Sequence, residues 1–228
     1  MSKEILRQIL GLKRPPPFEG FKQFYFGQEG EDIILEQILE PISSGFYVDV
    51  GAHHPFRYSN TLKFYLKGWN GINIDPLPGI MREFQKYRPK DINLEIGVAE
   101  KKGKRKYYMF SLPELNGFSR TTVLNKKEAL KYPLEKILKI NVFPLSEILK
   151  LHLPEGQEIS FLSIDVEGSE LSVLKSNNWK RYRPKVICLE IREQAKKNKK
   201  SQATIKYLAS KKYYFYTKTK NSLFFYTK

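Results

Sequence analysis

The sequence contains little cysteine and no long apolar run. Cys188 is the single cysteine among 228 residues, which excludes a fold held by disulfides and a metal site built from several thiolates. No stretch of about 18 residues is free of charge, so we expect no membrane-spanning helix. The first residues lack the apolar core of a signal peptide, because Arg7 and Gln8 interrupt them. We therefore expect a cytoplasmic protein.

Acidic residues are scarce relative to basic ones. The chain has 40 Lys and Arg residues against 24 Asp and Glu residues, a net charge of +16. This surplus favours an acidic partner such as nucleic acid, anionic lipid headgroups or a phosphorylated substrate. A solvated basic surface without a partner explains it equally well, because net charge does not say which face carries it.

The apolar pattern predicts strands that alternate with helices from about residue 46 onward. We expect strands at 46–50, 71–75, 92–98, 106–110, 140–143, 159–166, 184–191, 213–216 and 222–226. We expect helices at 3–12, 29–39, 59–66, 81–87, 145–150, 170–175 and 201–212. This order predicts an α/β fold with a mostly parallel, doubly wound sheet, closed by an antiparallel hairpin of the last two strands.

Acidic side chains stand at the ends of three predicted strands, namely Asp49, Asp75 and Asp165. Ligands of open parallel sheets bind beyond the carboxyl ends of the strands. Unpaired acids at the edge of a core are costly, so their presence there indicates a ligand site. Gly51 permits a tight turn and a close approach of the backbone to a ligand. The alternative is that Asp49 and Asp75 are turn residues.

The glycine pattern that binds a dinucleotide pyrophosphate is missing. His53, His54 and Pro55 stand where further glycines would be needed. Asp75 nevertheless occupies the position at which nucleotide-binding folds hold ribose hydroxyls. A ligand with a ribose but no pyrophosphate fits better, and S-adenosylmethionine is such a ligand. Asp49 would then face its positively charged amino group.

These motifs together resemble the FkbM-type methyltransferases. The resemblance covers roughly residues 24–195 and rests on 28–32 (QEGED), 47–52 (YVDVGA), 59–61 (SNT), 71–76 (GINIDP) and 163–170 (SIDVEGSE). It implies a Rossmann-like methyltransferase fold with a mostly parallel seven-stranded sheet and S-adenosylmethionine as the methyl donor. The chain departs from many members at His53, His54 and Pro55, where they have an asparagine and a glycine.

The resemblance also implies which residues bind the donor. The implied donor-binding residues are Gln28, Glu31, Asp49, Gly51, Ala52, His53, Asn60, Asp75, Pro76, Val98, Ala99 and Asp165. Of these, Asp49, Gly51 and Ala52 would line the methionine end, and Asp75 would bind the ribose.

The methyl acceptor needs help to lose its proton, because a sugar hydroxyl is a poor nucleophile near neutral pH. Asp165 and Glu167 share one face of a strand end and are the first candidates for a catalytic base. Together with Glu190 they could instead bind Mg²⁺ or Mn²⁺, which prefer oxygen ligands. His53 and His54 are the other candidate bases. The alternative for Glu167 is a role at the N-terminus of the following helix.

We therefore expect an S-adenosylmethionine-dependent O-methyltransferase that acts on a sugar, nucleotide-sugar or lipid-linked glycan. Residues 1–40 would be an N-terminal extension that packs on a methyltransferase domain of residues 41–228. Residues 111–136 lack clear periodicity and would form an insertion on the acceptor side, where Phe118, Arg120 and Tyr132 suit a sugar. The alternatives are an RNA methyltransferase, which the charge would allow, and a non-catalytic protein that retains the fold.

Overall fold

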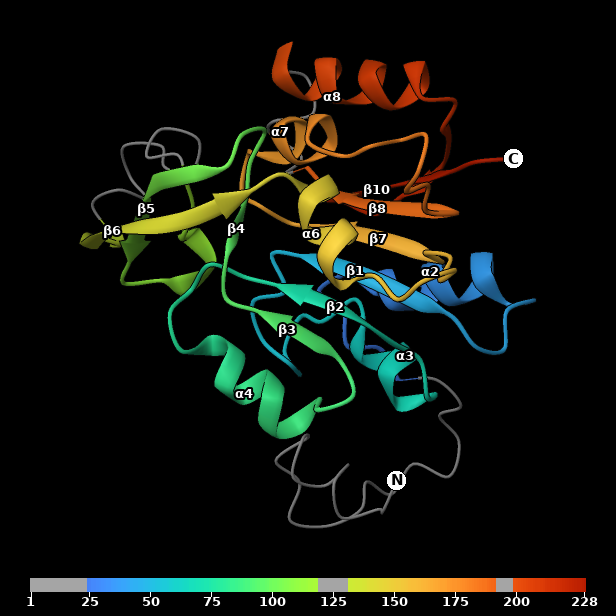
Figure 1. The fold of residues 1–228 in the computed structure, drawn as a ribbon, viewed down its shortest axis with the longest axis horizontal. Coiled ribbons are helices and arrows are strands. Elements are labelled where there is room, and N and C mark those ends of the chain that lie inside the picture. Colours follow the sequence, from blue (N-terminus) through green and yellow to red (C-terminus); the bar gives the residue numbers. More distant parts are fainter. Residues whose placement is uncertain (1–23, 119–130, 192–198) are drawn as a thin grey trace.

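The computed structural model describes residues 24–118, 131–191 and 199–228 (Figure 1). The helix expected at 3–12 and Arg120 lie outside these residues. In the described part of the chain, no helix is both long and apolar enough to span a membrane.

A seven-stranded sheet forms the centre of the fold, with the strand order β3-β2-β1-β7-β8-β10-β9. Its strands are β1 (Phe46–Val50), β2 (Asn70–Ile74), β3 (Ile92–Leu94), β7 (Phe161–Ile164), β8 (Val186–Glu190), β9 (Tyr214–Lys218) and β10 (Ser222–Tyr226). All neighbouring pairs are parallel except those of β10, which is antiparallel to both β8 and β9. This confirms the expected Rossmann-like α/β fold with its closing hairpin.

Helices cover both faces of this sheet (Figure 1). They are α2 (Glu31–Leu39), α3 (Leu62–Leu66), α4 (Ile80–Tyr87), α6 (Leu145–His152), α7 (Glu170–Lys175) and α8 (Lys199–Ser210). Leu149, Leu174 and Leu208 bring α6, α7 and α8 into one apolar cluster, whereas Leu35 and Phe64 bring α2 and α3 into a second. Every residue of β1 is buried, as expected of a strand covered on both faces.

A second sheet of three strands lies beside the first, in the order β4-β6-β5. It contains β4 (Gly97–Val98), β5 (Gly103–Phe110) and β6 (Leu134–Phe143), and a short 3₁₀ helix, η1 (Pro113–Leu115), follows β5. Two expectations were wrong here. The strand expected at 92–98 divides into β3 and β4, which belong to different sheets, and the strand expected at 140–143 already begins at Leu134. No side chain of β6 is buried between 134 and 139, so the sequence shows no apolar pattern in this part of the strand.

The N-terminal segment packs against the end of the chain. The carboxylate of Glu29 accepts hydrogen bonds from the backbone N–H (2.8 Å) and the side-chain amide (2.7 Å) of Asn221. Asp32 accepts hydrogen bonds from the N–H groups of Phe26 and Gly27, which fixes the entry into α2. The Glu29 bonds join this segment to the turn before β10, and the domain boundary at residue 40 stays a prediction.

Candidate active site

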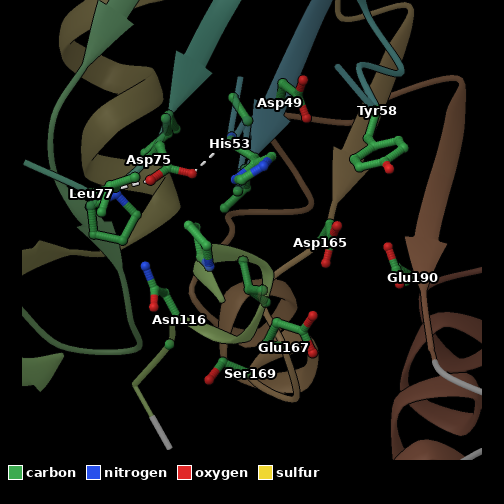
Figure 2. A pocket seen from close by; sticks show the side chains of 18 of the residues that line it. Asp49, His53, Tyr58, Asp75, Leu77, Asn116, Asp165, Glu167, Ser169 and Glu190 are labelled. Carbon is green, nitrogen blue, oxygen red and sulfur yellow. Dashed lines mark hydrogen bonds between the residues drawn. The ribbon is translucent and has the colours of Figure 1, made fainter. Parts of the chain in front are cut away.

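A pocket of about 460 Å³ lies at the carboxyl ends of β1, β2, β7 and β8 (Figure 2). This volume is typical of sites for small organic ligands. The chain order reverses between β1 and β7, so the pocket occupies the point at which open α/β sheets bind ligands. The second sheet, η1 and the β9–β10 turn complete the wall, for example through Tyr107, Leu115 and Lys220.

The pocket brings together most of the residues that the sequence singled out. Those that line it are Gln28, Asp49, Gly51, Ala52, His53, Asn60, Asp75, Pro76, Val98, Phe118, Tyr132, Asp165, Glu167 and Glu190. Glu31, His54 and Ala99 are not part of this lining. The lining also includes Tyr58, Asn116, Lys220 and Asn221, which sequence reasoning missed.

Gly51 lets the loop after β1 lie directly against the end of β7. Its φ of 86° is in the left-handed region, and a Cβ atom there would overlap the backbone oxygen of Asp165. The Asp165 N–H donates to the carbonyl of Val50 at 2.9 Å, so the two strand ends are in register up to this point. Any side chain at position 51 would therefore displace Asp165 from the pocket.

Asp75 holds the loop that follows β1. One carboxylate oxygen accepts the N–H of His53 and the other accepts the N–H of Leu77, each at 2.8 Å (Figure 2). Burial raises the pKa of Asp75, although both backbone bonds act in the opposite direction. A carboxylate oxygen has a second lone pair, so these bonds leave acceptor capacity for a ligand.

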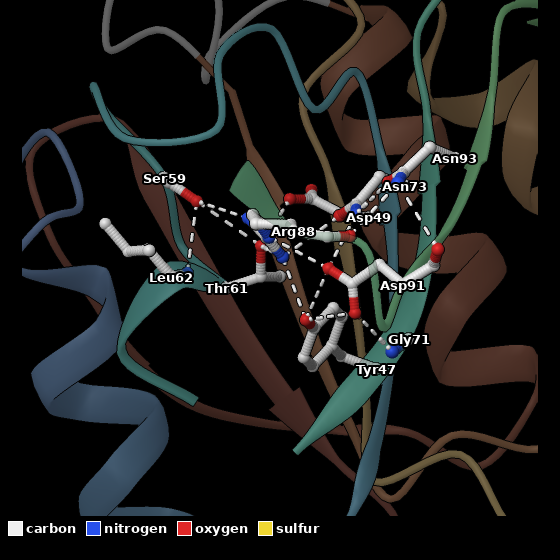
Figure 3. Close-up of polar contacts among 10 residues, drawn as sticks. All are labelled: Tyr47, Asp49, Ser59, Thr61, Leu62, Gly71, Asn73, Arg88, Asp91 and Asn93. Atoms are coloured by element: carbon white, nitrogen blue, oxygen red, sulfur yellow. Dashed lines mark hydrogen bonds and ion pairs between the residues drawn. The ribbon is translucent and has the colours of Figure 1, made fainter. Parts of the chain in front are cut away.

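Asp49 lies between the pocket and a buried polar network centred on Arg88 (Figure 3). It accepts a hydrogen bond from the Thr61 hydroxyl at 3.0 Å, and Thr61 in turn accepts one from Arg88 at 2.9 Å. Burial raises the pKa of Asp49 from 3.8 to about 6, although the charge of Arg88 and the Thr61 hydroxyl oppose this shift. Ionisation of Asp49 near neutral pH therefore lowers the stability of the folded protein.

Asp49→Asn should increase the stability of the ligand-free protein near neutral pH. Because the folded-state pKa is raised to about 6, the stability contributed by Asp49 is present below pH 3.8 and is lost as pH rises through about 6. A neutral asparagine removes this loss, so the free energy of unfolding at about pH 7 should rise by about 1–3 kcal/mol. Urea unfolding at several pH values measures it. Exposed Glu155→Gln is the control, and lower stability of Asp49→Asn at neutral pH would contradict the prediction.

Three carboxyl groups gather at the ends of β7 and β8. Asp165, Glu167 and Glu190 all line the pocket, and Figure 2 shows Asp165 and Glu190 on the side where Tyr58 lies. Burial raises the pKa of Asp165 well above its ordinary value, and the neighbouring charges of Glu190 and Glu167 raise it further. A buried carboxyl with a raised pKa is a competent proton acceptor once it is ionised.

The arrangement of these groups does not fit a metal ion. Across residues 24–118, 131–191 and 199–228, no group of three or more His, Cys, Asp or Glu side chains has the geometry to hold one. The expectation that Asp165, Glu167 and Glu190 bind Mg²⁺ or Mn²⁺ is therefore not supported.

The two adjacent histidines differ in their surroundings. His53 lines the pocket, whereas the Nδ1 atom of His54 accepts the N–H groups of Phe56 (3.1 Å) and Arg57 (3.2 Å). Burial lowers the pKa of His54 to about 4, helped by the charges of Arg57 and His53. His54 is thus a neutral acceptor that holds its own loop in place.

Glu31 also has a structural role outside the pocket lining. Its carboxylate accepts hydrogen bonds from the Ser222 hydroxyl and the Glu29 N–H, so it holds the N-terminal segment against β10.

Backbone strain concentrates at the pocket. Among the described residues, four that are not glycine have a positive φ, and three of these line the pocket: His53 (54°), Tyr58 (56°) and Glu167 (46°). Left-handed backbone costs energy for such side chains, and it is often found at active sites and ligand-binding loops. This strain marks Tyr58, which sequence reasoning did not single out.

Comparison with known protein families places this chain in one of them. A search of curated proteins gives no match. Among solved structures, the C-terminal domain of precorrin-6Y C5,15-methyltransferase from Rhodobacter capsulatus aligns with 11% identity and a TM-score of 0.41, over 86% of this chain and 85% of that chain. Residues 49–215 match the model of the methyltransferase FkbM domain. Since this match covers well over half of the chain and includes the end of β1 and all of β2, β7 and β8, the chain belongs to the FkbM methyltransferase family.

Proposed function

We propose that this methyltransferase transfers the methyl group of S-adenosylmethionine to a hydroxyl group of a sugar or glycan. The observation that carries the proposal is the joint presence of Asp49, Asp75 and Asp165 in one pocket at the strand ends. The first two would hold the donor, and the third would face the acceptor hydroxyl. The proposal includes a cytoplasmic location.

The donor would occupy the β1–β2 side of the pocket. Asp75 would accept hydrogen bonds from the ribose hydroxyls through the lone pairs that His53 and Leu77 leave available. Asp49 would pair with the amino group, whose positive charge would offset the cost of its own ionisation. Val98 lies where it could contact the adenine.

The acceptor side of the pocket suits a hydroxyl-rich ring better than RNA. Three carboxylic side chains lie on this side of the described pocket, namely Asp165, Glu167 and Glu190, whereas Lys220 is the single lysine or arginine of the whole described lining. Such a lining repels phosphates, although the whole chain is strongly basic. Tyr58, Phe118 and Tyr132 offer aromatic surface for a sugar ring.

Methyl transfer requires the acceptor oxygen, the methyl carbon and the sulfur in line. A pocket that holds both substrates supplies much of the acceleration through orientation. The acceptor oxygen forms a bond to the methyl carbon as the carbon–sulfur bond breaks, and the hydroxyl proton passes to a carboxylate. Asp165 is our candidate for that carboxylate, with Glu190 and Glu167 beside it.

Asp75→Ala should weaken S-adenosylmethionine binding by about 1–3 kcal/mol, since it removes charged hydrogen bonds to the ribose. Isothermal titration calorimetry with the donor, or with its demethylated product, measures this loss. Glu95→Gln is the matched control, because Glu95 is an exposed acid outside the pocket lining that binds the Gly79 N–H. Equal donor affinity in Asp75→Ala and the wild type would remove Asp75 from the donor site.

A further inference from the structure

The last 30 residues of the chain carry positive charge only. Residues 199–228 contain eight lysines and no aspartate, glutamate or arginine, so they account for half of the net charge of +16. They form α8 and the β9–β10 hairpin at one end of the central sheet. Figure 1 shows α8 and β10 at the opposite end of the molecule from α4. The charge is therefore concentrated at this end of the fold.

Exposed aromatic side chains lie within this basic region. Tyr214, Phe215 and Tyr216 are 48%, 55% and 54% exposed, although they are consecutive residues of a strand. Because successive side chains point to opposite faces, both faces of β9 are open. β9 is also the edge strand of the sheet. We define Tyr214, Phe215, Tyr216, Lys212, Lys218 and Lys228 as the β9 patch.

We propose that the β9 patch docks the protein onto an anionic lipid bilayer. Tyrosine and phenylalanine rings insert favourably at the boundary between the headgroups and the acyl chains of a bilayer. Lysines near an anionic membrane contribute about 1 kcal/mol each through charge attraction. Lys212, Lys218 and Lys228 are exposed, and the Lys228 ammonium lies 5.6 Å from the centre of the Tyr214 ring, so cation and ring would reach one surface together.

Other partners fit this surface less well. Arginine is favoured at RNA interfaces because its planar guanidinium forms bidentate hydrogen bonds, and residues 199–228 contain none. Arg183 contacts this region, but its guanidinium is used in hydrogen bonds within the protein. It donates to the Lys211 backbone oxygen (2.9 Å) and the Thr227 hydroxyl (2.8 Å). Edge-to-edge pairing of β9 with β9 of a second copy would bring like-charged lysines together. Natural edge strands carry lysines for this reason, because their repulsion prevents such pairing.

The β9 patch is connected to the pocket by the β9–β10 turn. Lys220 and Asn221 in this turn line the pocket, and they lie two and three residues after Lys218 of the patch. A bilayer bound at the patch would lie beside this wall of the pocket. If the proposed function holds, the acceptor is therefore a saccharide carried on a membrane lipid. This last step depends on the proposed function, whereas docking itself does not.

Vesicle flotation with the full chain tests the docking without donor or acceptor. We expect binding to vesicles of phosphatidylcholine mixed with phosphatidylglycerol, and none to pure phosphatidylcholine vesicles. The triple variant Lys212→Glu, Lys218→Glu, Lys228→Glu should bind at least about 100-fold more weakly, which corresponds to three lysines at about 1 kcal/mol each. High salt should also abolish wild-type binding, because ~1 M salt shortens the Debye length to ~3 Å.

The matched control is Lys101→Glu, Lys104→Glu, Lys106→Glu, which makes the same charge change at exposed lysines near and within β5. It should retain most of the binding, and thermal melting should show that both triple variants are folded. A second variant, Tyr214→Ser with Tyr216→Ser, should bind about 10-fold more weakly at unchanged charge. Equal losses in the two lysine variants would overturn the proposal, and so would binding of single-stranded RNA but not of anionic vesicles. Failure of methyl transfer would leave this readout unaffected.

Discussion

Replacing Arg88 with methionine is expected to lower the free energy of unfolding by about 3–5 kcal/mol, because it leaves a buried carboxylate without its partner. Arg88 follows α4, and its side chain is 0% exposed, as is that of Asp91. Its Nε atom donates to Asp91 at 2.8 Å, and its Nη2 atom donates to Tyr47, Thr61 and Asn73 (Figure 3). Methionine fills similar space but restores none of these bonds.

Urea unfolding of the purified variants measures this loss. Arg82→Met is the control, because Arg82 is exposed on α4, the helix that Arg88 follows, and its replacement should change stability by less than about 0.5 kcal/mol. The double variant Arg88→Met, Asp91→Asn should recover part of the loss, since it also removes the stranded charge. A loss below about 1 kcal/mol in the single variant would show that water or a neighbour compensates Asp91.

The Arg88 network also holds Asp49, one of the residues that line the pocket, in place. Thr61 links Arg88 to Asp49, and Asn73 and Tyr47 place the network across β1 and β2. Arg88→Met should therefore alter the position or ionisation of Asp49 in addition to lowering stability. This gives a physical reason for a buried ion pair at this place, where an apolar core would be at least as stable.

The central sheet could be predicted because its strands are short, continuous apolar runs. β1, β7 and most of β8 are buried along their length, so composition alone marks them. The β5–β6 ribbon gave such a signal only in part, at 106–110 and 140–143. It is held by backbone pairing between residues that lie largely outside the core, such as Lys104 with Asn141 and Lys106 with Lys139. Strands that are held mainly by backbone hydrogen bonds cannot be predicted from the pattern of apolar residues.

The site was predictable where a strand-end rule applied and not where distant residues meet. Asp49, Asp75 and Asp165 follow from the rule that ligands bind beyond carboxyl strand ends. Arg88 was missed because its partners other than Asp91 are distant in sequence, with Tyr47 41 positions away. The sequence also gave no means to separate His53, which lines the pocket, from His54, which caps its own loop.

Asp165→Asn should lower turnover by roughly 100-fold or more, while donor affinity changes little. The expected loss is that of a positioned proton acceptor, whereas the proposed ribose and methionine contacts lie on other strands. Burial and the Glu190 charge raise the pKa of Asp165, so the wild-type rate should rise as pH rises through this raised pKa. Asparagine does not titrate, so the variant should lose this rise.

A methyl-transfer assay on sugar acceptors, with an RNA oligonucleotide as the competing acceptor, measures turnover for each variant. Glu170→Gln is the matched control, because Glu170 binds the Gly168 N–H at the start of α7 and lies outside the pocket lining. It should keep turnover within a few-fold, since loss of a charge at a helix N-terminus costs only about 0.3–1 kcal/mol. Full activity in both Asp165→Asn and Glu167→Gln would exclude the carboxylates as bases, and His53, which also lines the pocket, would then be the leading candidate.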